Sequence, residues 1–137
     1  MKTQLVVLIA GFLAVSTAPV YAHHAFAAEF DRDKPITVTG SVTKLEWTNP
    51  HIWVYVDVKD ADGKIVNWAF QGGPPAYLTR VGWSKNDIKV GDVITITGSR
   101  SKDGSYAASG AKITLSDGRK VFTGTADQVG PDRSGEK

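Results

Sequence analysis

Alternation of apolar and polar residues with a period of two limits the fold of this chain more than any other feature. It runs through residues 36–43 and 52–58, and a third segment at 64–71 places Val66, Trp68 and Phe70 on one face. Because successive side chains of a β-strand point to opposite faces, the pattern predicts half-buried strands. Gly40 interrupts the first segment and predicts a bulge or bend at that position.

Turn residues separate these segments from one another and from weaker ones. Residues 60–63 predict a hairpin between the second and third strands, and Asp117-Gly118 predicts another before residues 119–122. Residues 93–98 and 107–115 have the composition of two further strands. Pro74-Pro75 predicts the start of a short helix over residues 76–81, because proline is tolerated in a first helical turn.

This order of elements predicts an all-β, mainly β domain, a small five-stranded OB-like barrel on the oligonucleotide/oligosaccharide-binding plan. One short helix lies between strands three and four, and an extra C-terminal hairpin follows. An open sandwich is the alternative. We expect the domain and its N-terminal arm to span residues 23–123. Residues 124–137 are rich in Gly, Pro, Asp and Ser, and we expect them to form a disordered tail.

Residues 1–22 have the pattern of a secretory signal peptide. Lys2 supplies a positive start, an apolar run covers residues 5–15, and Val20-Tyr21-Ala22 offers small residues at a cleavage site. Ala25-Phe26-Ala27 is a second acceptable cleavage pattern, farther from the apolar run. A transmembrane helix needs about 20 apolar residues, more than this run contains. We therefore expect a cleaved, exported, periplasmic protein with no membrane span after processing.

Composition excludes several classes of site. Cleavage after residue 22 would leave 115 of the 137 residues, enough for one domain. The chain has no Cys, which excludes disulfides, thiolate metal sites, iron–sulfur clusters and Cys nucleophiles. Its 16 basic and 14 acidic residues are interspersed, so neither nucleic acid nor an anionic membrane surface is an expected partner. We expect a monomer.

The three histidines fall at the expected new N-terminus and in one loop. Cleavage after residue 22 would place the α-amine of His23 beside its own imidazole, a chelating pair, and His51 would add a third nitrogen. Nitrogen ligands in such a T-shaped arrangement favour Cu(II) over Zn(II) and Ni(II). A second mode would use the amine together with the amide and imidazole of His24. The pattern predicts handling or delivery of a divalent transition metal, copper above others.

Two further observations bear on this metal hypothesis. No Met or Cys stands at the candidate site, which disfavours a soft-ligand Cu(I) chaperone. The N-terminal arm must also fold back to reach His51, and Phe26 and Phe30 could pin it by packing on Trp47 or Trp53. The alternative is that two histidines follow the cleavage site by chance and His51 caps a turn. Weaker candidates, as oxygen ligands, are Glu29, Asp31 and Glu46.

Aromatic side chains suggest a binding function of a different class. Trp53 and Tyr55 alternate with valines and therefore share the outer face of the second strand, with Trp47 shortly before it. Barrels of this class bind extended ligands on such a face, so the rings could dock a peptide, a glycan or a partner protein of the cell envelope. Alternatively, the arm or the C-terminal hairpin covers the rings, since large exposed apolar patches are rare on soluble monomers.

Enzyme motifs are absent from the sequence. There is no Gly-x-Ser-x-Gly nucleophile elbow and no glycine-rich phosphate loop that opens a helix. We therefore expect a protein that is not an enzyme.

Six short segments form a recognisable set: 23–31, 38–40, 46–51, 82–83, 91–93 and 115–119. The specific one contains Trp47-Thr48-Asn49-Pro50-His51, whereas the Gly-Asp and Asp-Gly pieces are generic turns. In these segments the chain resembles a family of small exported bacterial proteins catalogued as domain of unknown function 6152. The resemblance covers about residues 23–122. It implies an exported β-domain and carries over no catalytic residues.

Overall fold

The computed structural model describes residues 26–124, which are mainly β, as the sequence predicts. The strands form one six-stranded sheet, and both the helix between the third and fourth strands and the C-terminal hairpin are present. No helix in this described part is long and apolar enough to cross a bilayer. The predicted signal peptide, His23, His24 and the tail beyond residue 124 lie outside it. A helical turn over residues 26–29 precedes β1 (Phe30–Glu46), β2 (Trp53–Lys59), β3 (Ile65–Gln71), α3 (Pro75–Arg80), β4 (Val93–Ser101), β5 (Ala107–Leu115) and β6 (Lys120–Phe122).

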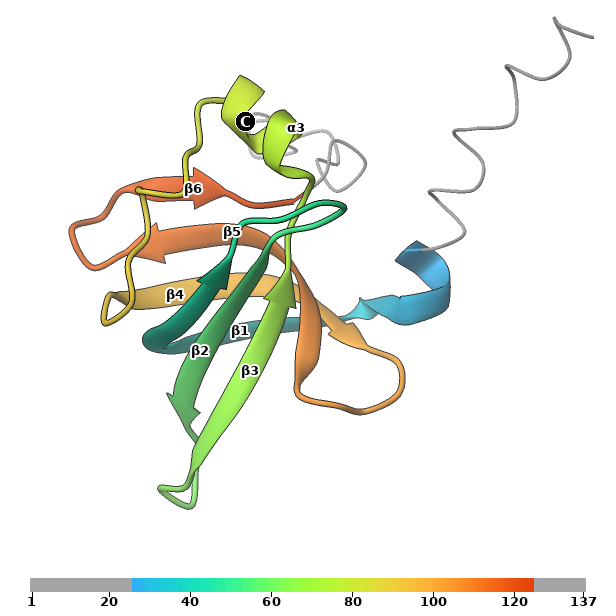
Figure 1. The fold of residues 1–137 in the computed structure, drawn as a ribbon. Helices are drawn as coiled ribbons and strands as arrows, with labels where there is room; N and C mark the ends of the chain where they lie inside the picture. Colours follow the sequence, from blue (N-terminus) through green and yellow to red (C-terminus); the bar gives the residue numbers. More distant parts are fainter. Residues whose placement is uncertain (1–25, 125–137) are drawn as a thin grey trace, which may run out of the picture.

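The sheet has the order β3-β2-β1-β4-β5-β6, and these neighbours are antiparallel. One further ladder joins β3 to β5 in parallel and pairs Ala69 with Ala107 and Gln71 with Ser109. β5 therefore pairs with three strands. Figure 1 shows strongly curved strands, with α3 beyond the end of the sheet at which β3 finishes.

β1 is longer at its N-terminal side than the alternation predicts, since it begins at Phe30 instead of residue 36. Phe30 pairs with Ser101 of β4, and regular pairing resumes at Pro35 after an irregularity. Residues 32–35 between these points are exposed, so no apolar alternation marks them. The sequence missed this stretch because its side chains do not contribute to the core.

The bulge of β1 lies at Thr43, not at Gly40 as predicted. The register with β2 shifts by one residue between Val42 and Lys44, whereas Gly40 pairs regularly with β4. Before the shift, the buried residue is the even-numbered Val42; after it, the odd-numbered Leu45 packs against the core. A one-residue insertion exchanges the two faces of a strand, and this bulge sets the outer face described below.

Side chains from the sheet, α3 and the following linker form one core. The predicted alternation of β2 is confirmed, since Val54 and Val56 are buried while Trp53 and Tyr55 between them are only half-buried. The face of β3 that carries Trp68 and Phe70 is buried too. The core residues are Val42, Ile52, Val54, Val56, Trp68, Phe70, Leu78, Trp83, Ile88, Ile94, Ile96, Ala108, Ile113, Leu115 and Val121.

α3 is short because the proline that begins it, Pro75, and the glycine that follows it, Gly82, stand close together in the sequence. Pro75 occupies the first turn, where its missing N–H costs nothing, and Leu78 is the one buried residue of the helix. Gly82 has φ of +90°, a conformation that glycine adopts without strain. The next residue, Trp83, donates its backbone N–H to the Leu78 carbonyl at 2.9 Å. This turn directs the Trp83 ring into the core.

The close approach of β1 and β2 generates a stability prediction. A Cβ atom on Gly40 would lie 2.1 Å from the carbonyl oxygen of Asp57, a backbone atom that cannot move aside without breaking the ladder. We expect Gly40→Ala to lower the free energy of unfolding by about 2 kcal/mol or more, as overpacked sites do. The control, Ser41→Ala, changes the next, exposed residue and should cost less than about 0.5 kcal/mol. Urea unfolding of both variants tests this, and equal stabilities would contradict it.

Candidate functional site

His51 lies in the β1–β2 loop at a point where the backbone is anchored. The next residue, Ile52, is fully buried; its N–H donates to the Gly73 carbonyl at 3.2 Å and its carbonyl accepts the Gly72 N–H at 2.9 Å. His51 itself is half-buried and follows a cis Asn49–Pro50 peptide bond. The imidazole therefore extends from the residue next to the hydrogen-bonded Ile52.

The structure does not assemble the predicted metal ligands, because two of the three histidines, His23 and His24, lie outside residues 26–124. Within those residues, no three His, Asp or Glu side chains stand close enough to hold a metal ion. The weaker oxygen candidates are separate from one another. Asp31 lies 3.6 Å from Lys34, and Glu46 is paired with Lys44.

Trp53 and Tyr55 lie on the outer face of β2, as predicted. Trp53 is paired with Glu46 on β1 and with Gln71 on β3, and Tyr55 is paired with Ala69. Both rings are half-buried by neighbours in the sheet. This pair of rings, with the side chains beside it on β1 and β3, is called here the β2 outer surface.

Trp47 does not belong to the β2 outer surface, although the sequence placed it there. Its ring packs on Trp83, with centroids 4.8 Å apart, and lies against the core. The bulge explains the difference. After Thr43, odd-numbered residues of β1 face the core, and Trp47 continues the phase of Leu45.

An ion pair on β1 holds the Tyr55 ring, and sequence reasoning missed it. Lys44 pairs with Glu46, the Tyr55 hydroxyl donates to Glu46 Oε2 at 3.1 Å, and Lys44 Nζ lies 5.2 Å from the ring centroid. Burial raises the pKa of Tyr55, and the hydrogen bond to Glu46 raises it further. The hydrogen bond from Lys44 holds the pKa of Glu46 below its usual value. The available signal was the change of phase between Val42 and Leu45.

A polar group borders the rings on the other side. The Asn67 side chain donates to Asp57 Oδ1 at 2.7 Å and to Thr43 Oγ1 at 3.1 Å. The Thr43 hydroxyl donates in turn to the Tyr55 carbonyl oxygen at 3.3 Å. The bulged residue is therefore tied to β2 and, across it, to β3, and the rings have hydrogen-bonding groups on two sides.

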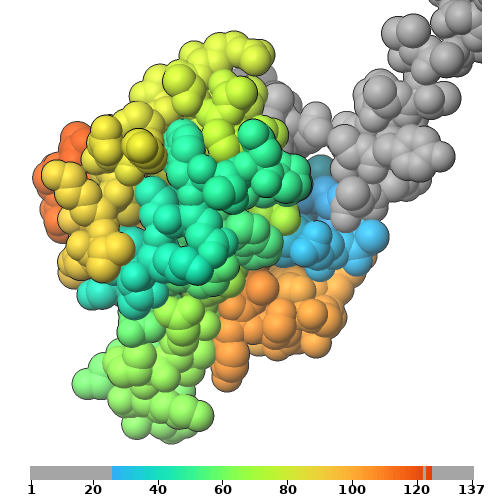
Figure 2. Space-filling model, viewed as in Figure 1, coloured from blue at the N-terminus to red at the C-terminus, as the bar shows by residue number. Residues whose placement is uncertain are grey.

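The start of the described chain packs elsewhere than expected. Phe26 and Phe30 contact each other, with ring centroids 5.5 Å apart, instead of packing on Trp47 or Trp53. The backbone carbonyl of Glu29 accepts a hydrogen bond from the backbone N–H of Lys102 at 3.0 Å, and the Lys102 side chain donates to the Ala27 carbonyl. Figure 2 shows these residues, in blue, against the orange β4–β5 loop.

A family model for a family of unknown function, DUF6152, matches residues 10–111. The chain belongs to this family. The match includes the 46–51 segment on which the resemblance chiefly depended, and it begins earlier and ends earlier than the 23–122 expected. The DUF6152 model carries no activity, so it identifies no functional residue. A search of curated proteins and a search of solved structures each found no match.

The pair of Glu46 and Tyr55 generates a prediction on ionisation. In Glu46→Gln we expect the pKa of Tyr55 to fall, because the negative charge that opposes phenolate formation is removed. The pKa should still stay above the usual value for tyrosine, since burial is the larger cause of its rise. NMR of the Tyr55 ring against pH measures this, with Glu29→Gln as the control. An unchanged or higher Tyr55 pKa in Glu46→Gln would contradict the assignment.

Proposed function

We propose that this chain is an exported, periplasmic, non-catalytic protein that binds a divalent transition metal, copper above others, and handles or delivers it. His23 would chelate the ion through its α-amine and imidazole once the signal peptide is removed. His51 would be the third ligand and His24 an auxiliary one. The observation that carries the proposal is the half-buried imidazole of His51, held beside the anchored Ile52.

The site requires the N-terminal arm to reach the β1–β2 loop. His23 precedes Phe26 by three residues, which span up to about 10 Å when extended. A metal ion would then join the new N-terminus to the loop. Binding of the ion would add to stability in proportion to its affinity for the folded chain.

We also propose that β1–β5 form the predicted closed, OB-like barrel. The pairings run from Glu46 to Trp53, Gln71, Ser109 and Ser99. They return to β1 at Pro35, eleven positions before the starting residue. A circuit that closes with such a stagger is what a barrel of tilted strands requires. In the alternative, an open sandwich, β3 and β5 would not pair with each other.

Copper titration tests the metal site. We expect the mature protein, with a start at His23 verified by mass spectrometry, to bind one Cu(II) more tightly than the peptide His-His-Ala-Phe. His51→Ala should weaken binding by at least about tenfold, since loss of even a supporting group at metal sites costs about 10–100-fold. Asn49→Ala, in the same loop, is the control and should bind as the native protein does.

Three outcomes of this titration would refute the three-nitrogen site. They are a mature chain that starts at another residue, affinity no higher than that of the free peptide, and unchanged affinity in His51→Ala. The last outcome, combined with loss of binding in His24→Ala, would assign copper to the second mode, which needs no folded domain.

A second candidate function is docking of a peptide, glycan or envelope protein on the β2 outer surface. The half-buried rings of Trp53 and Tyr55, bordered by Gln71 and Asn67, favour it, because bases, sugars and apolar side chains all stack on such rings. Two observations weigh against it. Trp47 lies apart, and the Lys44–Glu46 pair already occupies the Tyr55 ring.

Array binding distinguishes the two candidates. If the β2 outer surface is the site, native protein should select ligands from peptide and oligosaccharide arrays, and Trp53→Ala should lose about 1–3 kcal/mol of that affinity, the usual contribution of one stacked ring. Tyr106→Ala, which removes a ring 55% exposed elsewhere, should leave it unchanged. If Trp53→Ala selects ligands as the native protein does, or if the native protein selects none, docking on the β2 outer surface is excluded.

A further inference from the structure

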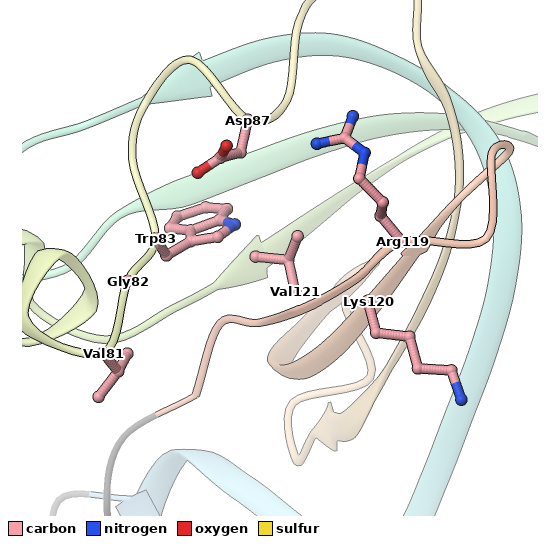
Figure 3. A pocket seen from close by; sticks show the side chains of 7 residues that line it. All are labelled: Val81, Gly82, Trp83, Asp87, Arg119, Lys120 and Val121. Carbon is pink, nitrogen blue, oxygen red and sulfur yellow. The ribbon is translucent and has the colours of Figure 1, made fainter.

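A recess lies between the linker after α3 and the start of β6, apart from the sites described above. It has a volume of about 350 Å³ and is partly open. This volume is within the range of small-molecule pockets, which is about 300–1,000 Å³. Figure 3 shows Trp83 and Asp87 from one segment opposite Arg119 and Val121 from the other, with the Val81 and Lys120 side chains pointing outward. The residues that line the recess are Val81, Gly82, Trp83, Asp87, Arg119, Lys120 and Val121.

The Trp83 indole lacks a hydrogen-bond partner. Trp83 is 4% exposed, and its Nε1 atom is buried without an acceptor among the described residues. In Figure 3 this nitrogen is on the edge of the ring that faces Val121, on the side of the recess where Arg119 lies. An unpaired buried donor costs about 1–3 kcal/mol, and an indole can only donate. The recess therefore lacks an acceptor atom at this point.

Among the charged side chains around the recess, the groups without a hydrogen-bond partner are mainly donors. Arg119 Nε donates to Asp117 Oδ2 at 2.7 Å, which leaves the two terminal guanidinium nitrogens for another acceptor. Asp87 Oδ2 is occupied by the backbone N–H of Ser84 at 2.6 Å. A ligand must therefore present acceptors to Trp83 and Arg119 together.

Nearby carboxylates limit the charge that such a ligand can carry. Asp87 lines the recess, and both Asp87 and Asp92 act electrostatically on Arg119 and help to raise its pKa, after the larger effect of Asp117. A phosphate, with about −1.5 to −2 charges, would be repelled by these groups more strongly than a single carboxylate. Lys120 also lines the recess, so Asp87, Arg119 and Lys120 together carry one net positive charge, which a monoanion balances.

We propose that this recess binds a carboxylate, which accepts hydrogen bonds from the Trp83 indole N–H and the Arg119 guanidinium. The open side admits either a small free carboxylate or the terminal carboxylate of a peptide. Val121 supplies an apolar wall for the carbon atoms attached to the carboxylate. This site uses neither the histidines nor the β2 outer surface, so its test does not depend on the proposed function.

NMR titration of the mature protein measures carboxylate binding at the Trp83 indole directly. We expect the indole N–H resonance of Trp83, assigned with Trp83→Phe, to shift saturably on addition of acetate, while that of Trp53 stays in place. Arg119→Gln should weaken the binding about tenfold or more, because hydrogen bonds to charged groups are the strong ones. Arg80→Gln, which removes a charge from the last turn of α3, is the matched control and should bind as the native protein does.

Two further ligands distinguish the source of the carboxylate. Tighter binding of N-acetyl-trialanine than of acetate, with no binding of its C-terminal amide, would indicate peptide termini. Equal binding of acetate and the peptide would indicate small free carboxylates. The proposal is overturned if acetate and the peptide give no saturable shift, if Arg119→Gln binds like the native protein, or if inorganic phosphate binds more tightly than acetate.

Discussion

The structure depends above all on the pairing of β1 with two strands at once. Its first half lies against β4 and its second half against β2, so a single segment joins both sides of the sheet. The bulge at Thr43 lies in the second half and exchanges the faces of the strand there. Without it, Leu45 would point to solvent and Lys44 to the core, at a large cost for burying a charge. Core and outer surface are both consequences of this one extra residue.

The candidate sites occupy different parts of this framework. The β1–β2 loop carries His51, the outer face of β2 carries the two rings, and the recess lies between the linker after α3 and β6. Trp83 connects two of these regions, since one side of its ring packs on Trp47 and its N–H faces the recess. The linker after α3 and the β1–β2 loop are therefore in direct contact through two indole rings tilted by 36°.

Most of the fold could be predicted from the sequence, and the parts that could not have physical reasons. Period-two alternation located β2 and β3 almost to the residue, because those strands bury one face, and composition located β5. The start of β1 was missed, since residues 32–35 are exposed and leave no apolar pattern. The position of the bulge was visible only as a change of phase, and Gly40, the more obvious signal, turned out to serve the close approach of Asp57.

Sites were harder to predict than strands. Trp53 and Tyr55 were placed correctly because a strand fixes the direction of every second side chain. Trp47 was misplaced because it follows the bulge. The recess could not be predicted, since Trp83 and Arg119 are far apart in the chain and meet only through the packing of β6 on β5. The histidine site stays a prediction, because His23 and His24 lie outside the described residues.

The long separation between paired strands has a consequence for how the chain is made. Phe30 finds its partner only at Ser101, and β3 finds its parallel neighbour only at residues 107–109. Long-range pairings of this kind slow folding, because the entropy cost of closing a large loop comes before any stabilising contact forms. While the chain emerges from the ribosome, β1 has no β4 to pair with until nearly four-fifths of the described segment has been synthesised. Completion of the core is thus a late event, and a nascent chain of this protein stays open for most of its synthesis.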